Sequence, residues 1–152
     1  MPLYSNQFNM TVTKGMVDAS TPNRLQVGKI SASQGTAIGV ATPVKINDEA
    51  SKVIPLIART AATDKPEGFL VFNTHRETFS AGMTVEYAPC GSHAIVILEA
   101  SAAIANGAKV EMVISGNKVA TSGGSNTVIG TALDKATAAG QLIRVRLDIK
   151  AY

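Results

Sequence analysis

The sequence predicts an all-β protein: an antiparallel jelly-roll-like sandwich or barrel with glycine corners and an extended N-terminal arm. Three observations lead to this fold class. Apolar and polar residues alternate along several short segments, glycines punctuate the chain between them, and no long helical pattern is present. The 152 residues, 45% hydrophobic and 16% charged, suffice for one buried core. We therefore expect an extended arm over residues 1–17 and a single all-β domain over residues 18–152.

The arm begins with "MPLYSNQFNMTVTKG", which has no helical period and carries two aromatic residues, Tyr4 and Phe8, on a polar tract. Such a segment cannot by itself bury enough apolar surface to offset the entropy of ordering it. Two interpretations stay open. It is either a frayed terminus or a strap whose aromatic residues bind pockets of a neighbouring chain, with "MTVT" adding a strand to a sheet edge.

The strands are expected in short segments along the rest of the chain. The clearest is "QLIRVRLDI", which places Ile143, Val145 and Leu147 on one face and Arg144 and Arg146 on the other. "AKVEMVIS" alternates in the same way, and Gly116-Asn117 after it predicts a tight antiparallel hairpin. In "ASKVIPLIART", Pro55 disfavours a helix. The other strand candidates are "RLQVGKI", "AIGVATPVKI", "GFLVFN", "TVEYA", "HAIVILE" and "TVIGTAL".

Three segments of similar sequence, "SAGMTV", "ANGAKV" and "AAGQLI", each carry a glycine three positions before a Val or Ile. The glycines are Gly82, Gly107 and Gly140. A glycine at this place adopts a backbone conformation that other residues reach only at a cost, and it turns the chain into the next strand. The sequence therefore predicts three corners between antiparallel strands.

Charge and cysteine usage exclude several classes of protein. Fourteen basic and eleven acidic residues give a net charge of +3, and no two basic residues are adjacent, so no nucleic-acid-binding stripe is visible. Cys90 is the only cysteine, which excludes an intramolecular disulfide. No signal peptide is visible at the start, and the longest apolar run, residues 94–98, is too short to cross a membrane. We expect a protein made in a reducing cytoplasm, with no membrane partner.

Candidate catalytic groups are few. Cys90, Ser92 and His93 form the one cluster of a catalytic or metal-binding kind, but no third group to orient a base and no set of four metal ligands accompanies them. We interpret "PCGSH" as a turn. Three glutamates could form an acid–base pair: Glu86, Glu99 and Glu111. They fall on different predicted strands, each at an outward position or a strand end, so we expect solvated faces or interface salt bridges instead. We expect no enzyme activity, and no catalytic, cofactor-binding or metal site.

Arg144 and Arg146 share one face of their predicted strand. Asp148 lies on the same face, and the chain has few aromatic residues to stack bases. The sequence therefore favours an acidic protein partner for these two arginines rather than a nucleic acid.

From Gly68 to Ile149 the order of these features resembles the cement or head-decoration proteins of tailed bacteriophages. The resemblance rests on "GFLVFNTHRETFSAGMTVEYAPCGSHAIVILEASAAIANGAKVEMVISGNKVA" and "VIGTALDKATAAGQLIRVRL". The matching positions are Phe79, Gly82, Val85, Glu99, Ala100, Ile104, Gly107, Val110, Ile129, Gly130, Ala132, Asp134, Gly140, Ile143 and Arg144.

The resemblance implies a small, non-enzymatic virion protein. It would bind the outer surface of an assembled icosahedral head, clamp adjacent major capsid subunits and stabilise the shell. It would also bind itself as a homo-oligomer, with a dimer favoured over a trimer. On this hypothesis the partner-binding residues are Tyr4, Phe8, Arg144 and Arg146, and neither nucleic acid nor a small-molecule substrate is expected. Two alternatives stay open: a small nucleic-acid-binding barrel, which needs a clustered basic face, and a small-molecule enzyme or binding module, which needs a deep polar pocket.

Overall fold

The computed structural model of the chain describes residues 14–17, 24–59, 61, 64–72, 76–113, 117–124 and 126–149. These residues form twelve strands, and the only helical residue among them is a single 3₁₀ position at Asn117. Within the described ranges, no helix has the length and apolar character needed to cross a membrane. The all-β prediction is confirmed.

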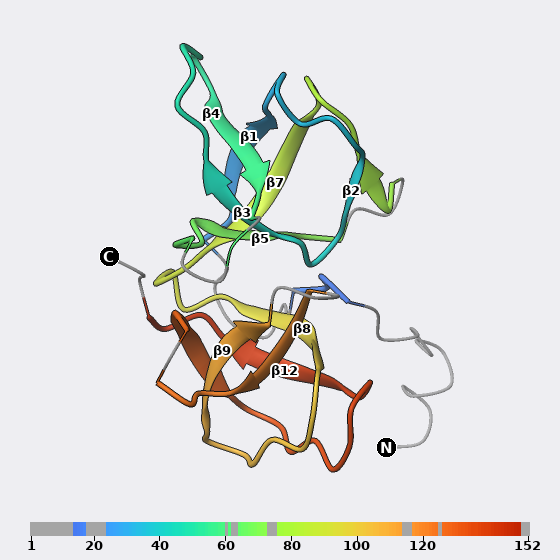
Figure 1. The fold of residues 1–152 in the computed structure, drawn as a ribbon, viewed down its shortest axis with the longest axis vertical. Coiled ribbons are helices and arrows are strands. Elements are labelled where there is room, and N and C mark those ends of the chain that lie inside the picture. Colours follow the sequence, from blue (N-terminus) through green and yellow to red (C-terminus); the bar gives the residue numbers. More distant parts are fainter. Residues whose placement is uncertain are drawn as a thin grey trace, which may run out of the picture.

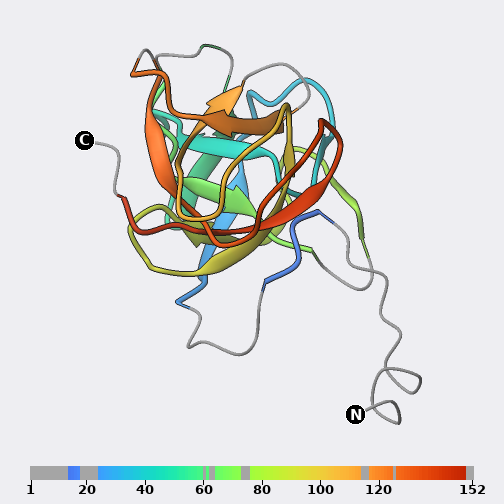
Figure 2. The same cartoon turned by 90° about the horizontal axis from the view of Figure 1, so that it is seen from below.

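Ten of the twelve strands close into two five-stranded barrels that are stacked along the longest axis of the molecule (Figure 1). The first barrel has the order β1-β4-β3-β5-β7 and the second β10-β8-β12-β11-β9. Figure 2 shows the second barrel from its free end, with the first behind it. The remaining pair, β2 and β6, forms a small two-stranded sheet beside the first barrel. The strands of the first half are β1 (Gln26–Ile30), β2 (Ile38–Gly39), β3 (Pro43–Ile46), β4 (Ile54–Ala58), β5 (Gly68–Leu70), β6 (Thr78–Phe79) and β7 (Thr84–Pro89). Those of the second are β8 (Ile95–Ala100), β9 (Lys109–Val113), β10 (Lys118–Thr121), β11 (Val128–Ala132) and β12 (Leu142–Arg146).

The two barrels have the same topology. If the five strands of each barrel are lettered a to e in chain order, both follow the ring a-c-b-d-e. In both, strands a and c pair in parallel, as β1 with β4 and β8 with β10, and every other pair is antiparallel. The small β2–β6 pair also has a counterpart, the isolated bridge between Ile104 and Ala136. The chain is therefore an internal duplication of one barrel unit.

The backbone hydrogen bonds at the strand ends repeat from barrel to barrel. In the first barrel, N–H groups donate to carbonyl oxygens from Gly82 to Ile30, Ala41 to Leu70, Ser31 to Leu56, Val71 to Glu86 and Arg59 to Pro43. The equivalent bonds in the second run from Gly140 to Ala100, Gly107 to Ala132, Ser101 to Val119, Leu133 to Arg144 and Ser122 to Lys109. This correspondence equates individual residues of the two halves and allows their surfaces to be compared position by position.

The repeat explains the predicted corners. Gly82, Gly107 and Gly140 all adopt a positive φ, of 85°, 81° and 87°, and each lies two residues before a strand, as the sequence predicts. Gly82 and Gly140 occupy the same corner of the two barrels. The counterpart of Gly107 is Ala41, which has a φ of 60° and hence the same turn without a glycine.

Each barrel is closed by a glycine on strand d that leaves no room for a side chain. A Cβ atom at Gly68 would lie 2.3 Å from the carbonyl oxygen of Ala88, and one at Gly130 would lie 2.0 Å from that of Arg146. Because Ala88 and Arg146 occupy equivalent positions on strand e, the two glycines make the same close approach. The backbones of strands d and e can pass this closely only if position d is glycine.

The alternation of apolar and polar residues in the sequence determines which side chains are buried in the core. On β12, Ile143 and Val145 are buried while Leu142 and Arg144 are exposed, and on β9, Val110 and Met112 are buried. Antiparallel pairing of β9 with β10 confirms a hairpin at the predicted place, with Asn117 at a φ of 51°. Val113 pairs with Lys118, so the connection spans residues 114–117 and is longer than the predicted two-residue turn. Glu111 departs from the expectation of a solvated glutamate: it is buried, and Gly123 N–H and the Asn126 side-chain amide donate to its carboxylate.

The two barrels are in direct contact along a seam. Buried side chains of the first barrel pack in the same apolar cluster as the core of the second: Ala41, Phe69, Val71, Ala88 and Cys90. Asn117 also donates from its side-chain amide to the Thr42 hydroxyl, 3.2 Å away. The closed barrels confirm the barrel alternative, whereas the parallel pairs were not predicted, and the structure does not confirm a jelly-roll-like strand order. The boundary between arm and domain stays a prediction, since residues 1–13 lie outside the described ranges.

Candidate interaction surfaces

Residues 14–17, here the bridging segment, join the two barrels at one side of the seam. The Gly15 carbonyl oxygen accepts from Phe72 N–H of the first half, while Gly15 N–H donates to Ile97 of β8. Ile97 N–H donates in turn to the Met16 carbonyl oxygen, and Val17 forms a bridge with Val96. The bridging segment thus pairs with β8 through an isolated bridge, and it connects the start of the described chain to both barrels.

An ion-pair network fixes this segment. Glu99 lies 3.0 Å from the Lys14 ammonium and 2.9 Å from that of Lys118. Hydrogen bonds from Lys118 and then Lys14 hold the pKa of Glu99 below its ordinary value. Glu99 is therefore a structural anchor, in agreement with its interpretation as a salt-bridge residue rather than a general acid.

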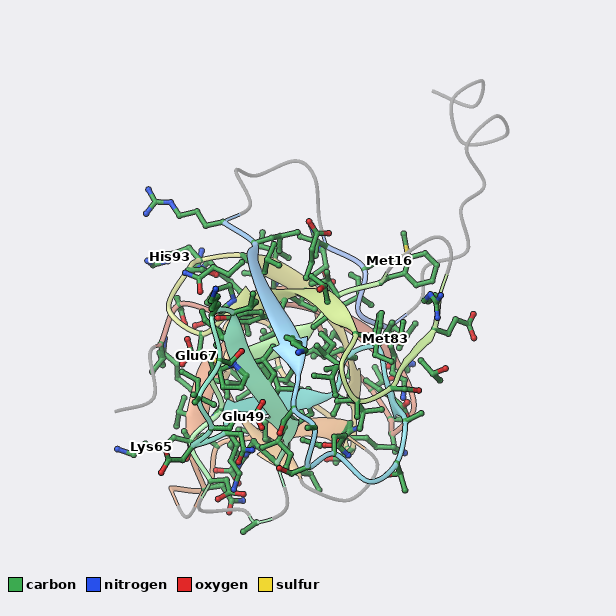
Figure 3. The ribbon with its side chains drawn as sticks, turned by 90° about the horizontal axis from the view of Figure 1, so that it is seen from above. Met16, Glu49, Lys65, Glu67, Met83 and His93 are labelled. Atoms are coloured by element: carbon green, nitrogen blue, oxygen red, sulfur yellow. The ribbon has the colours of Figure 1, made fainter. Side chains whose placement is uncertain are left out.

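The Cys90 cluster lies in the segment through which the chain passes from the first barrel to the second, on the other side of the seam. Figure 3 shows His93 and Met16 on opposite sides of the molecule. Gly91 N–H and His93 N–H both donate to the carbonyl oxygen of Leu147, and the Ser92 hydroxyl donates to that of Pro89, as in the predicted turn. Burial raises the pKa of the Cys90 thiol to about 12, so the thiol is protonated and weakly nucleophilic at neutral pH.

A polar cavity of about 270 Å³ opens beside this crossing, lined by Arg24, Gln26, Glu67, Pro89, Cys90, Gly91 and Ser92. At its edge the Tyr87 hydroxyl donates to the Gln26 side-chain oxygen at 2.8 Å. Burial, together with the neighbouring Glu67, raises the pKa of Tyr87 to about 12. Within the described ranges, no group of three His, Cys, Asp or Glu side chains is placed to hold a metal ion.

Arg144 and Arg146 on β12, the two arginines predicted to bind a partner, contact acidic residues of their own chain. Arg144 contacts Asp134, with an N–O distance of 2.8 Å, and its backbone N–H also donates to that carboxylate. Arg146 lies 3.4 Å from Asp148, which also accepts a hydrogen bond from Thr131. A partner that binds these arginines has to share them with Asp134 and Asp148. Their assignment as partner-binding residues stays a prediction, as does that of Tyr4 and Phe8, which lie outside the described residues.

Sequence reasoning missed an apolar face on the outside of the first barrel. Val27 of β1 is 52% exposed and Val53, just before β4, is 37% exposed. The register of β1 with β4 and of β4 with β3 places the outward side chains of Pro55 and Ile57 in the same row, next to Lys29 and Lys45. We call Val27, Lys29, Lys45, Val53, Pro55 and Ile57 the β1–β4 face.

The equivalent face of the second barrel is covered. Ile97, the counterpart of Val27, is only 8% exposed because the bridging segment pairs with it. The counterparts of Lys29 and Pro55 are Glu99 and Lys118, which form an ion pair with each other. The duplicated surface is therefore open in one half of the molecule and closed by the chain itself in the other.

A groove follows the seam where the bridging segment enters it. Its volume is about 400 Å³, and it is lined by Lys14, Val40, Phe72, Glu77, Glu99, Gly140 and Leu142. Leu142 is 38% exposed at its edge, although it lies on a strand next to the core. We call this the seam groove. Over the described residues the chain is a two-barrel, all-β protein with exposed apolar side chains on the β1–β4 face and at the seam groove.

Comparisons with known proteins give the family. The model of the structural cement protein family, described by E217 gp24 and Pam3 gp6, matches residues 4–148. The chain belongs to this family of bacteriophage structural proteins, and so it is a virion protein that associates with the capsid. Among solved structures, the head fiber gp8.5 N base of bacteriophage phi29 is similar in fold, with a TM-score of 0.57 and 15% identity over 84% of this chain and 98% of that one. A search of curated proteins finds no match.

Proposed function

We propose that this protein is a non-enzymatic cement that binds the outer surface of the assembled icosahedral head and clamps adjacent major capsid subunits. It is made in the host cytoplasm and acts as a homo-oligomer, with a dimer favoured over a trimer. Family membership supports the capsid as partner. The buried, protonated Cys90 supports a structural role for the cluster that most resembled a catalytic site.

We assign head binding to the β1–β4 face. The observation that carries this assignment is the contrast between the two halves, since only the first barrel leaves its copy of the surface open. Lys45 is paired with Asp64 at 2.9 Å, so Lys29 is the lysine that adds positive charge beside the exposed valines. Apolar area next to a positive charge suits a protein surface with acidic groups. Val27 and Val53 are 52% and 37% exposed, so burying the rest of each side chain is worth on the order of 1 kcal/mol before the entropy of association is subtracted.

A ligand that binds only the assembled state stabilises that state by mass action. A cement that contacts two adjacent capsid subunits therefore opposes their separation without any chemical step. Two or more linked copies gain further through their effective concentration on the shell.

The alternative of a nucleic-acid-binding barrel gains no support from the second half of the chain. Four basic side chains of its described residues lie next to carboxylates: Lys109 and Arg146 contact Asp148, Lys118 contacts Glu99, and Arg144 contacts Asp134. Such pairs lower the positive potential that phosphate binding requires.

Heads stripped of the protein provide the test. The double variant Val27→Asp/Val53→Asp removes apolar area and adds charge of the wrong sign, so it should bind such heads at least about tenfold more weakly, a loss of about 1.4 kcal/mol. The matched control is Thr121→Asp, an exposed position on β10, the strand equivalent to β4. Binding of the double variant at wild-type strength would refute the assignment, as would an equal loss in the control.

A further inference from the structure

The seam groove has the properties of a binding site for an uncharged segment with an aromatic side chain. Val40, Phe72 and Leu142 supply an apolar lining, and Leu142 remains exposed there. Two acidic residues also line it, Glu77 and Glu99. Glu99 is bound by Lys14 and Lys118, so its charge is balanced within the chain. A volume of about 400 Å³ accommodates an aromatic side chain and the residues next to it.

The N-terminal residues provide a segment of this kind. Residues 1–13 contain no Asp, Glu, Lys, Arg or His, and they include Tyr4 and Phe8. They join the bridging segment at Lys14, which itself lines the groove. The family match begins at residue 4, so it includes both aromatic residues. An uncharged, aromatic-bearing segment therefore starts at the edge of an apolar groove.

The length of the segment indicates whether it fills the seam groove of its own chain or that of a second copy. Thr11, Val12 and Thr13 favour an extended backbone, and no glycine or proline lies between Phe8 and Lys14 to turn the chain back. Six extended residues span roughly 20 Å. A groove of about 400 Å³ is only on the order of 10 Å across. An extended segment that starts at the groove's own lining residue carries Phe8 past it.

We propose that Phe8 of one copy docks in the seam groove of a second copy, against Phe72 and Leu142. In a pair with twofold symmetry each chain gives its segment to the other, so the contact occurs twice and the pair is closed. This proposal rests on the homo-oligomeric part of the proposed function and not on head binding. It also explains why Leu142 is exposed in a single chain, since the second copy covers it.

Cysteine cross-linking in the full-length protein tests the exchange without any heads. The buried Cys90 stays in place, since its raised pKa keeps it unreactive. Phe8→Cys and Leu142→Cys are made as separate variants, one carrying a size tag, and are mixed under mild oxidation. The expected result is a disulfide-linked pair of one tagged and one untagged chain. Lys135→Cys, exposed and outside the seam groove, replaces Leu142→Cys in the matched control and should cross-link far less.

A second variant makes every outcome decisive. In the double variant Phe8→Cys/Leu142→Cys, a link confined to single chains, with none in the mixture, would show that each chain fills its own groove and would overturn the exchange. Absence of any link in both experiments, with a wild-type circular dichroism spectrum, would overturn docking in the groove. Sedimentation of Phe8→Ala should show self-association at least tenfold weaker than wild type, and an unchanged constant would contradict the proposal. Cross-linking together with a failure to bind heads would refute only the proposed function.

Discussion

Alanine at Gly130 or Gly68 should destabilise the protein by similar amounts, because the two glycines close equivalent barrels. A Cβ at these positions would lie 2.0 Å and 2.3 Å from a carbonyl oxygen of strand e, where ordinary contact begins at 3.4 Å. Strands d and e would therefore have to separate by more than about 1 Å. Overpacking of this kind together with a weakened hydrogen-bond ladder costs roughly 2–4 kcal/mol.

Differential scanning calorimetry measures the effect. For a chain of this length the loss should lower Tm by roughly 5–15 °C. Gly35→Ala is the matched control, because no atom lies within 4 Å of its would-be Cβ and its φ is not in the left-handed region. Its Tm should change by no more than about 2 °C. If Gly130→Ala and Gly68→Ala have the same Tm as the wild type, strands d and e do not approach each other as closely as described. If only one of them is destabilised, the equivalence of the two barrels fails at this position.

Three further predictions concern the thiol, the bridging segment and the shell. Cys90, with a pKa raised to about 12 by burial, should react with a thiol reagent at pH 8 roughly a thousandfold more slowly in the folded protein than in urea, and rapid native-state labelling would contradict its burial. The pKa of Glu99 is lowered in the folded state, so its contribution to stability is present above the ordinary glutamate value and is lost as the pH falls through the folded value. The free energy of unfolding of Glu99→Gln should therefore be about 1 kcal/mol lower than that of the wild type at pH 7. In chemical denaturation this difference should shrink below about pH 4. A difference that does not depend on pH would assign the loss to packing. Heads that lack the protein should release DNA at a lower temperature than complete heads in a dye-release melt, and equal melting would show that the protein does not strengthen the shell.

The sequence was sufficient for the local features of the fold. Alternation predicts which side chains of β12 and β9 are buried, because a strand next to a core buries every second residue. Gly82, Gly107 and Gly140 are recognisable as corners, because a positive φ strongly favours glycine. Glu111 was misjudged because the two donors to its carboxylate, Gly123 and Asn126, lie outside its own strand.

The features that depend on long-range pairing were not predicted. The similarity of the segments around Gly82 and Gly140 was the one trace of the duplication, but the third corner at Gly107 obscured it, since its counterpart in the first barrel is Ala41. Parallel pairing of β1 with β4 leaves no local signal, as the two strands are joined through other elements. The β1–β4 face escaped notice because an exposed valine differs from a buried one only through what covers it. Residues 14–17 cover this face only on the second barrel and leave it open on the first.

Electron cryo-microscopy of heads saturated with this protein would show directly whether the β1–β4 face binds the shell. We expect density for both barrels outside the shell, with the β1–β4 face of the first barrel against the capsid and the second barrel farther from it. We also expect another copy of the protein among the neighbours of each chain. Density on the inner surface of the shell, or an outer position in which Val27 and Val53 face solvent, would refute head binding through this face.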